Sequence, residues 1–426
     1  MAIKGSGSPM EAVDEYFDML IKSRFNEMFG DLKQESPWES YKLSELFDLT
    51  MGKTPSRDTP KYWSNGVYPW VSISDITSSN GVINDTKEKI SEDAVAESGI
   101  KQIDAGTVLM SFKLSIGKTA LTKFPLYTNE AIVAFVPKKS EVINNSFLQE
   151  WIKEKNWNEG SNKAVKGATL NKATLKEMRI HIPPIRLQNQ FADFVGQVNK
   201  SKRTYKRIFE SFDNLVKSRF NEMFGGHTEL SRWPCYSVAD VCSVKVGVVI
   251  KPAQYYTLEK DGIKTFRSLN IGENCINDKE WVYFTKEGNE CNKRTVLKEN
   301  DVIVARSGLP GVACVIPKEY EGCNAVDVII ATPNTSRVNP YYLAYYTNSP
   351  HGKQQIVSRG AAQQHFNVGS YEKVTLALPP LELQNEFVDF VKQVDKSKFE
   401  VVQSLLRLKS KYIRTETPSK RTDCDL

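Results

Sequence analysis

Two stretches of the chain carry apolar residues at alternating steps of three and four positions, the pattern of a helix that pairs with another helix. The first stretch follows Pro183-Pro184, a dipeptide that suits the start of a helix but cannot lie inside one. Its apolar or small positions are Phe191, Phe194, Val198, Ser201, Tyr205, Ile208, Phe212 and Leu215. The pattern predicts a helix from about Ile185 to Asn221, roughly 55 Å long at 1.5 Å per residue.

The same pattern returns near the C-terminus, after a second Pro-Pro dipeptide at 379 and 380. Its apolar or small positions are Phe387, Phe390, Val394, Ser397, Val401, Leu405, Leu408 and Tyr412, with a slip of one position near Val401. We expect this helix to pair with the central one. Residues 10 to 25 repeat the later half of the central helix, so we expect them to pack near the C-terminal helix in the same bundle.

The segments between these helices have a different pattern. Short β-branched and aromatic runs (VLMSF, AIVAFV, DVIVA and VDVIIA) alternate with Gly, Asn and Pro. This pattern predicts two mixed α/β or mainly β domains of about 150 residues each.

The chain contains a duplication. PPIRLQNQFADFVGQVNKSK at 183 returns as PPLELQNEFVDFVKQVDKSK at 379, and KSRFNEMFG occurs at 22–30 and again at 217–225. The similarity between these anchors is thin but in register, since WVSISDI at 70 answers FRSLNI at 266 and NEAIVAFVP at 129 answers NAVDVIIATP at 324. We therefore predict an α+β fold in which two mixed α/β domains, in a pseudo-twofold arrangement, are joined by long antiparallel coiled-coil helices. The predicted segments are 1–30 (leader and N-terminal helix fragment), 31–182 (first domain), 183–225 (central helix), 226–378 (second domain) and 379–426 (C-terminal helix and tail).

Length and composition agree with this plan. A chain of 426 residues is too long for one ordinary core, and 40% hydrophobic with 25% charged residues and a mean hydropathy of -0.42 is typical of a soluble globular protein. No apolar run approaches the roughly 18 residues of a membrane helix, and the opening MAIKGSGSP lacks the apolar region of a secretory signal. We expect a cytoplasmic protein without a membrane partner.

Charge and cysteines narrow the functional classes. A net charge of +6 with a pI near 8.7 permits a nucleic-acid partner without requiring one. The seven cysteines all lie in the second half and form no C-x-x-C pair, so zinc and redox templates fail and reduced, mostly buried thiols are expected.

Catalytic motifs are not found. GKT at 52 and 117 lacks the Gly that a phosphate-binding loop needs five positions earlier, where Phe47 and Phe112 stand. The four histidines form no metal-binding pattern, no G-x-G-x-x-G follows a strand, and neither Pro-Pro pair follows the Asn or Asp of an amino-methyltransferase motif. The sequence favours a binding protein without a bound metal or cofactor.

Candidate binding residues gather in loops. In the first domain, GKTPSRDTPKYWSNGVYPWVSISDI mixes cations, hydroxyls and aromatics, the side chains that contact phosphates and base edges. Tyr62, Trp63 and Trp70 are better explained as core or loop anchors, and each single lysine can equally be a solvated surface charge. The DNA-contact candidates of the first domain are Lys53, Ser56, Arg57, Lys61, Ser72, Ser74, Lys113, Lys118, Lys166 and Lys172.

The second domain has diverged at the matching positions. Arg can read guanine, and Asn or Gln can read adenine, through two hydrogen bonds each, so divergence here is expected if each domain reads a different half-site. The DNA-contact candidates of the second domain are Lys251, Arg267, Ser268, Asn270, Arg306, Arg359, Gln363 and Gln364.

In this arrangement of repeated helices and diverged domains, the chain resembles the specificity subunit of type I restriction-modification systems. The resemblance runs from Glu11 to Tyr412 and is carried by PPIRLQNQF, PPLELQNEF, the two KSRFNEMFG copies, and GKTPSR, YW, PWVSISDI and GATLNK of the first half; VGVVIKPAQYY replaces GKTPSR in the second. It implies that residues 31–182 and 226–378 are target-recognition domains for the two halves of a split, asymmetric double-stranded DNA sequence. It further implies that the paired helices set the gap between the half-sites and dock two methyltransferase subunits.

The resemblance also implies a non-catalytic subunit used in DNA methylation and host defence. S-adenosylmethionine, Mg²⁺ and ATP would be bound by the partner modification subunits and by ATP-dependent restriction subunits. One alternative is a tandem-domain scaffold or adaptor without sequence-specific DNA binding, which a steep loss of affinity with salt and a preferred split sequence would exclude. Another is a self-sufficient methyltransferase, whose catalytic motif is not visible.

Overall fold

The computed structural model describes residues 9–30, 36–113, 115–139, 141–157, 162–164, 167–225, 233–258, 261–356 and 366–415. The chain forms two compact units, one of Glu15–Arg203 and one of Met1–Asp14 with Thr204–Leu426. These bounds fall inside two long helices, whereas the boundaries predicted from the sequence lie where each globular domain meets a helix. The first and second domains predicted above belong to different units.

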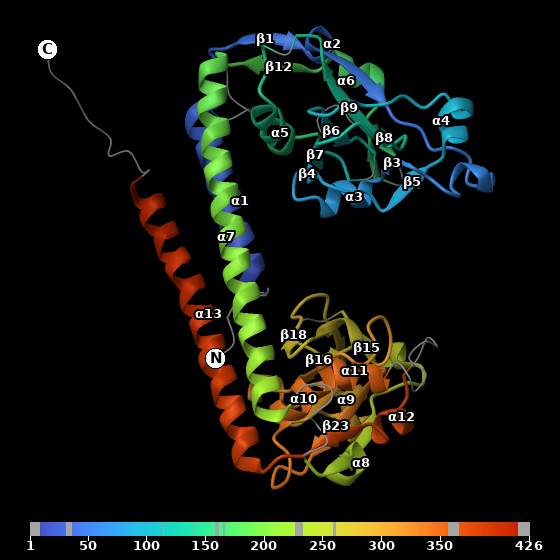
Figure 1. Cartoon of the computed structure of the whole chain (residues 1–426), viewed down its shortest axis with the longest axis vertical. Coiled ribbons are helices and arrows are strands. Elements are labelled where there is room, and N and C mark those ends of the chain that lie inside the picture. Colours follow the sequence, from blue (N-terminus) through green and yellow to red (C-terminus); the bar gives the residue numbers. More distant parts are fainter. Residues whose placement is uncertain are drawn as a thin grey trace, which may run out of the picture. The chain divides into compact units, whose positions relative to one another are not determined.

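Three long helices carry the repeated sequences (Figure 1). They are α1 (Pro9–Phe29), α7 (Ile185–Phe224) and α13 (Leu381–Thr415). At 40 residues, α7 is about 60 Å long and starts where Pro183-Pro184 predicted. Both KSRFNEMFG copies end in a glycine with positive φ, Gly30 at 78° and Gly225 at 90°, which ends α1 and α7 as a left-handed cap.

The unit Glu15–Arg203 is built on short strands with these bounds: β1 (Glu39–Lys42), β2 (Phe47–Met51), β3 (Tyr68–Val71), β4 (Val82–Ile83), β5 (Glu88–Ile90), β6 (Val108–Ser111), β7 (Thr119–Thr122), β8 (Tyr127–Thr128), β9 (Ile132–Pro137), β10 (Asn162–Ala164), β11 (Gly167–Thr169) and β12 (Arg179–Ile182). The sheet orders are β2-β9-β6-β7-β4 and β5-β3-β8, with separate pairs β1-β12 and β10-β11. All four residues of β6 are buried, because both faces of the larger sheet are covered. The shorter helices are α2 (Leu43–Leu46), η1 (Pro60–Tyr62), α3 (Ile73–Ser78), α4 (Glu92–Ser98), α5 (Asn145–Glu154) and α6 (Lys172–Glu177).

The other unit repeats this plan. Its strands are β13 (Cys235–Ser237), β14 (Cys242–Val246), β15 (Tyr256–Thr257), β16 (Ile263–Phe266), β17 (Ile271–Gly272), β18 (Cys275–Ile276), β19 (Val282–Phe284), β20 (Val302–Ala305), β21 (Ala313–Val315), β22 (Asn324–Ala325), β23 (Val328–Pro333) and β24 (Thr375–Ala377). The order β14-β23-β20-β21 matches β2-β9-β6-β7, and β19-β16-β22 matches β5-β3-β8 with β15 added at one edge. Its shorter helices are α8 (Val238–Val241), η3 (Pro252–Tyr255), η4 (Ser268–Asn270), α9 (Lys286–Cys291), η5 (Lys293–Thr295), η6 (Lys318–Tyr320), α10 (Pro340–Asn348), α11 (Pro350–Ile356) and α12 (Val368–Glu372).

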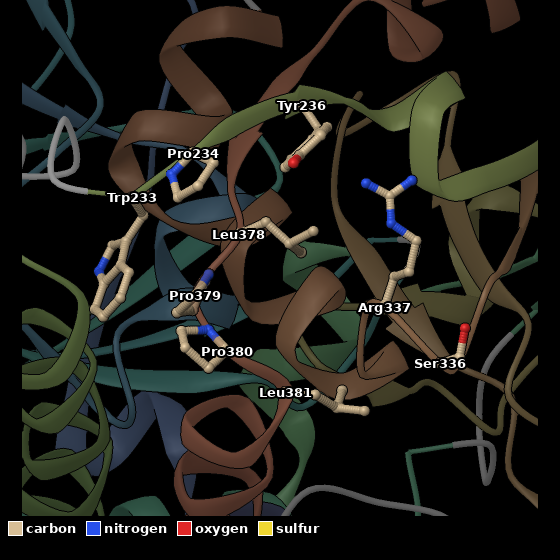
Figure 2. Close-up of a pocket in the computed structure, with 9 residues that line it drawn as sticks. All are labelled: Trp233, Pro234, Tyr236, Ser336, Arg337, Leu378, Pro379, Pro380 and Leu381. Atoms are coloured by element: carbon tan, nitrogen blue, oxygen red, sulfur yellow. The ribbon is translucent and has the colours of Figure 1, made fainter.

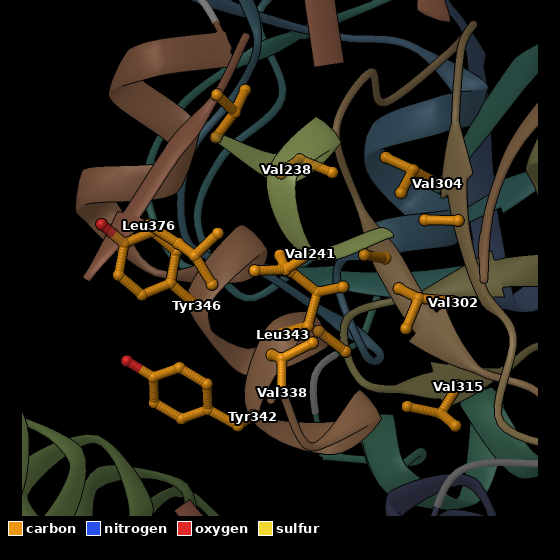
Figure 3. Packing of buried hydrophobic residues seen from close by; sticks show 14 of the residues in the cluster. Val238, Val241, Val302, Val304, Val315, Val338, Tyr342, Leu343, Tyr346 and Leu376 are labelled. Carbon is orange, nitrogen blue, oxygen red and sulfur yellow. The ribbon is translucent and has the colours of Figure 1, made fainter. Parts of the chain in front are cut away.

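One face of this second sheet packs on α10. Tyr342, Leu343 and Tyr346 of α10 and Val302 and Val315 of the sheet are all buried in one hydrophobic cluster (Figure 3). The predicted α+β fold with two repeated domains and long helices is therefore confirmed.

The repeated sequences form the same joint twice. Phe25 and Phe29, at the end of α1, contact Phe147 of α5 and Phe191 of α7 with ring centroids 4.9–5.6 Å apart. At the end of α7, Phe220 and Phe224 contact Tyr342 and Phe387 at 4.9–6.0 Å. The end of the helix in each KSRFNEMFG copy thus packs against the start of the next long helix and against a short helix of the adjoining globular domain.

The Gln of each LQN motif fixes this joint. Gln188 is fully buried, donates to the carbonyls of Val142 at 3.1 Å and Pro183 at 2.7 Å, and accepts from the Asn144 amide at 2.8 Å. Gln384 makes the corresponding bonds to the Arg337 carbonyl at 3.1 Å, the Pro379 carbonyl at 2.8 Å and the Asn339 amide at 2.8 Å. The following asparagines, Asn189 and Asn385, accept from the side chains of Asn144 and Asn339 at 2.9 and 2.8 Å. The motif therefore attaches each long helix to the domain that precedes it.

The long helices pair antiparallel, as predicted. Near the start of α13, Arg219 bonds Glu386 at 2.9 Å, and further along Lys398 bonds Asp213 at 2.7 Å. On α1, Asp18 bonds Lys202 of α7 at 3.2 Å, and Phe25 meets Phe191. The packing of α1 beside α13 stays a prediction.

The predicted seam needs a correction in its later part. Phe191, Val198, Phe387 and Val394 are buried, and Phe194, Tyr205, Phe212, Phe390 and Val401 are half-buried. Ile208 and Leu215 are 38% and 49% exposed, however, and their neighbours Phe209 and Val216 are buried instead; on α13, Val402 is more buried than Val401. A straight helix drifts about 20° per heptad from a 3.5-residue repeat, and α7 changes partner from α1 to α13 along its length, so the buried stripe moves on by one residue. The side chain of Leu408 lies outside the described residues.

Candidate nucleic-acid interface

The loop that follows β2 in the first domain lies against the turn between β8 and β9. The amide of Gly52 donates to the carbonyl of Ile132 at 3.1 Å, and the amide of Lys53 donates to that of Thr128 at 2.8 Å. A Cβ on Gly52 would lie 2.2 Å from the Asn129 carbonyl oxygen, so only glycine allows this approach. The GKTPSR loop is thereby held against the end of the sheet.

Arg57 has a structural partner within this loop region. Its guanidinium donates two hydrogen bonds to Glu88, at 2.5 and 2.9 Å, and lies 3.6 Å from the centre of the Trp63 ring. These bonds lower the pKa of the Glu88 carboxyl. Trp70 is buried and meets Trp63 edge-on at 5.1 Å, and Tyr62 packs on the same cluster, so the interpretation of these aromatics as anchors is confirmed. A DNA contact by Arg57 stays a prediction. It would be made by a side chain that already bonds Glu88.

Other first-domain candidates are partly engaged. Lys61 donates to Glu97 at 2.6 Å, and Ser72 caps α3 through its bonds with Asp75, including one of 2.6 Å from its hydroxyl. Ser74 is exposed, with its hydroxyl 2.9 Å from that of Ser72. Lys118 donates to the Thr77 hydroxyl at 2.9 Å.

The remaining candidates of this domain lie at the surface. Ser56 and Lys172 are exposed, and Lys53 is exposed with its ammonium bonded to the Ser98 carbonyl. Lys113 is half-buried with its ammonium 5.5 Å from the centre of the Phe112 ring. Lys166 lies outside the described residues.

A carboxylate that the sequence did not single out stands among these groups. Glu130 accepts a hydrogen bond from the Thr54 hydroxyl, which lowers its pKa, and the nearby Lys113 and Arg57 act in the same direction. Little in the sequence points to this pair, because Glu130 lies in the turn before β9 while Thr54 is 76 positions away. A carboxylate at this position can accept from a base amino group such as cytosine N4.

In the second domain, several candidates serve the fold. Asn270 is fully buried, accepts from the Arg267 amide at 3.0 Å and donates to the Lys279 carbonyl at 2.8 Å. The prediction that Asn270 contacts DNA is therefore wrong, because its polar atoms are already bonded inside the domain. Arg267 donates to the Glu280 carbonyl.

Arg306 and Ser268 hold two loops together. Arg306 donates to Asp327 at 2.6 Å and to the Phe366 carbonyl at 2.9 Å, and only 15% of its side chain is exposed. The hydroxyl of Ser268 lies 3.3 Å from that of Ser307. These residues position loops, and any direct contact with a base stays a prediction.

Lys251 is exposed in the loop that corresponds to GKTPSR, where Gly247 makes the same approach to the sheet as Gly52. Its φ of 44° is left-handed, a conformation that residues other than glycine rarely adopt. Arg359, Gln363 and Gln364 lie outside the described residues.

A surface pocket of about 400 Å³ lies at the joint of the second domain with α13 (Figure 2). Its lining is mostly apolar, and its one cation, Arg337, lies 4.7 Å from the centre of the Tyr236 ring and donates to the Asp240 carbonyl at 2.8 Å. The pocket residues are Trp233, Pro234, Tyr236, Ser336, Arg337, Leu378, Pro379, Pro380 and Leu381. With its only cation already bonded, this pocket is poorly suited to a phosphate.

The part of the chain that the structure describes holds no candidate metal site. No group of three or more His, Cys, Asp or Glu side chains could hold a metal ion there. The six described cysteines are free, but Cys235, Cys275 and Cys291 are exposed, so the expectation of mostly buried thiols is wrong for half of them. Burial raises the pKa of Cys323 to about 11 and that of Cys242 to about 12. Among the described helices, none combines the length and apolarity needed to cross a membrane.

Comparison with known proteins places the repeat in a family. The model of the family described as type I restriction modification DNA specificity domain matches the chain twice, over residues 35–208 and 231–407. The MjaIX specificity subunit of a type I restriction enzyme from Methanocaldococcus jannaschii is 23% identical over 401 residues, which cover 87% of this chain and 90% of that protein. The EcoprrI specificity subunit from Escherichia coli is 33% identical over 98 residues, 23% of this chain and 24% of that protein.

Solved structures of the same class are similar along most of the chain. The S subunit from M. genitalium aligns over 91% of this chain and 98% of its own, with 13% identity and a TM-score of 0.42. The HsdS subunit from Thermoanaerobacter tengcongensis aligns over 89% and 93%, with 17% identity and a TM-score of 0.33.

Proposed function

This chain belongs to the type I restriction-modification DNA specificity family, and we propose that as a specificity subunit it recognises a split, asymmetric sequence in double-stranded DNA. Residues 31–182 would bind one half-site and residues 226–378 the other. The observation that carries the proposal is the presence of two copies of the family domain on one chain, with matching sheets but different loop residues. The family assignment also makes the scaffold without DNA binding the less favoured alternative.

The two domains share the residues of their joints but differ in their loops, which supports recognition of two different half-sites. The joint residues repeat with near-identical geometry, whereas Lys113 of the first domain corresponds to Ser307 of the second and Thr54 corresponds to Val249. Side chains at such loop positions decide which base edges can be contacted. Two domains with the same frame and different loops would read two different short sequences.

The chain itself would act as a non-catalytic targeting subunit. Two methyltransferase subunits would dock on the long helices, and ATP-dependent restriction subunits would join them. S-adenosylmethionine, Mg²⁺ and ATP would be bound by these partners. The duplicated helices would offer the two methyltransferase copies similar surfaces.

The test is the methylome of a methylation-free host that expresses this chain with the methyltransferase encoded beside it. We expect a new motif of two short blocks around a fixed unread gap. Replacing residues 31–182 with the corresponding domain of another specificity subunit should change one block and leave the other. Stable copurification of the subunits without any new methylation mark would contradict the proposal and favour the scaffold.

A second measurement separates DNA binding from assembly. Affinity of the assembled complex for its target should fall steeply with salt, because cations released from the phosphates drive binding. A complex whose affinity for DNA neither depends on salt nor differs between target and random duplex would argue against recognition.

A further inference from the structure

The second domain carries two large aliphatic side chains that are exposed at the tips of adjacent loops. Ile250 is 80% exposed and Leu309 is 72% exposed. Single exposed aliphatics are common on proteins, but these two lie in the loops that correspond to the DNA-contact candidates of the first domain. Their position therefore calls for a specific explanation.

The two loops meet at Asp327. The Asp327 amide donates to the Val248 carbonyl at 3.1 Å, which ties it to the loop of Ile250. Its carboxylate accepts from Arg306 at 2.6 Å, which ties it to the loop of Leu309. The tips accordingly belong to one assembled surface.

Backbone geometry marks the same place independently. Lys251, next to Ile250, has a φ of 44°, and Asp327 has a φ of 50°. Left-handed residues other than glycine persist only where the surroundings hold them, and they cluster at functional sites. The surface is therefore held in an unfavourable backbone conformation by its own hydrogen bonds.

The first domain has polar or covered residues at both positions. Its loop from Ser111 to Gly117 closes like the loop from Ala305 to Gly311, through bonds of 3.0 and 2.9 Å between the end residues. Counting along these two loops, which have equal length, Ser115 corresponds to Leu309. Counting from Gly52 and Gly247, which bond the sheet in the same way, the buried Pro55 corresponds to Ile250. The apolar tips are thus a property of the second domain.

Among the described residues of the second domain, two polar candidates are already bonded within the fold. Asn270 is buried, and Arg306 is bonded to Asp327 and Phe366. Beside the tips, Lys251 is exposed and suits a phosphate, whereas Ser268 is half-buried with its hydroxyl 3.3 Å from that of Ser307. On the base edges of the major groove, the one apolar group is the C5-methyl of thymine.

We propose that Ile250 and Leu309 read thymine in the half-site of the second domain by contact with its C5-methyl group. This inference rests on the proposed function, since it names how one of the two domains selects its bases. A protein partner is less suited to the tips, because Ile250 and Leu309, even with the partly exposed Val249 and Leu269 near them, are too few to supply the roughly 800 Å² per partner of a stable protein interface.

The test uses the assembled complex and duplexes that carry the split sequence found in the methylome. Each thymine of the second half-site is replaced in turn by uracil, which removes the methyl group alone. Wild-type complex should bind about fourfold more weakly when a contacted thymine is replaced, the effect of one buried methyl group. The Ile250→Ser, Leu309→Ser double variant should bind the thymine and uracil duplexes equally.

Leu258→Ser is the matched control. Leu258 is fully exposed and follows β15, at the opposite edge of the four-stranded sheet from β22 and Asp327. This variant should keep the wild-type preference for thymine. Uracil in the first half-site should affect wild-type and double variant to the same extent.

Three outcomes would overturn the inference while leaving the proposed function intact: a second half-site without an A·T pair, equal binding of uracil duplexes by wild type, or a preference unchanged in the double variant. Loss of copurification of the methyltransferase with the double variant would show that the tips dock protein and would also overturn it. Failure to find any split sequence would instead refute the proposed function.

Discussion

The buried glutamine at the second joint offers the sharpest test of how a recognition domain is attached to its helix. Gln384 is fully buried, and its side chain bonds the amide of Asn339 and the carbonyls of Arg337 and Pro379. Gln384→Ala removes all three bonds and leaves three buried main-chain groups without this partner. At a net value of about 1 kcal/mol per bond, the joint should lose about 3 kcal/mol.

Hydrogen exchange measured by mass spectrometry reads this loss directly. The Asn339 amide is itself the donor to Gln384, so its exchange reports opening of the joint. A loss of about 3 kcal/mol corresponds to roughly 150-fold faster exchange of peptides that contain Asn339 and the start of α10. The effect should be confined to this joint, and peptides around Asn144 should exchange as in the wild type.

Gln393→Ala provides the control, because Gln393 lies on the same helix with an exposed side chain. We expect less than about 0.5 kcal/mol from this substitution. Equal exchange at Asn339 in Gln384→Ala and Gln393→Ala would refute the reasoning, since it would mean that the buried hydrogen bonds do not hold the joint closed.

Three further predictions address packing, DNA contact and pH. Phe224→Ala should lower the free energy of unfolding by about 3–5 kcal/mol in chemical denaturation, because Phe224 is fully buried between Tyr342 and Phe387, whereas Leu215→Ala at a half-exposed position should change it by less than about 1 kcal/mol. Lys113→Ala should weaken DNA binding and reduce the slope of log affinity against log salt by about 1 if its ammonium contacts a phosphate, and an unchanged slope would remove Lys113 from the interface. Burial raises the pKa of the Glu150 carboxyl, so the contribution of Glu150 to stability is present below the unfolded pKa and is lost as pH rises through the folded pKa. Glu150→Gln should therefore raise the melting temperature at neutral pH and make the melting temperature depend less on pH above 4.5. A lower melting temperature of this variant at neutral pH would contradict the prediction.

The domain order and the long helices could be predicted from the sequence, because the two copies of the duplicated segments can be compared with each other. Both Pro-Pro dipeptides start long helices, and both KSRFNEMFG copies end one. The helix-pairing positions are predicted less accurately. A heptad count assumes one partner helix along the whole length, but α7 pairs with α1 near Phe191 and with α13 near Asp213. The count therefore chose Ile208 and Leu215 over Phe209 and Val216.

The candidate site was harder to predict, because residue type does not reveal direction. Asn270 and Ser74 are both polar residues in a short helix that follows a strand, yet Asn270 is fully buried and Ser74 is exposed. Arg57 could not be assigned to Glu88 from the sequence, since 31 positions separate them. The apolar tips also gave no signal, because Ile250 and Leu309 look like ordinary core residues until the fold shows them in loops.

The joint has a consequence for how such a chain can evolve. Gln188 and Gln384 bond only main-chain atoms, and the domain carbonyl that each one reaches belongs to Val142 in one copy and to Arg337 in the other. Every residue type supplies the same carbonyl, so substitutions there leave the attachment unchanged. A domain can therefore drift toward a new target sequence while its mounting on the helix is inherited intact, and selection on recognition is uncoupled from selection on assembly.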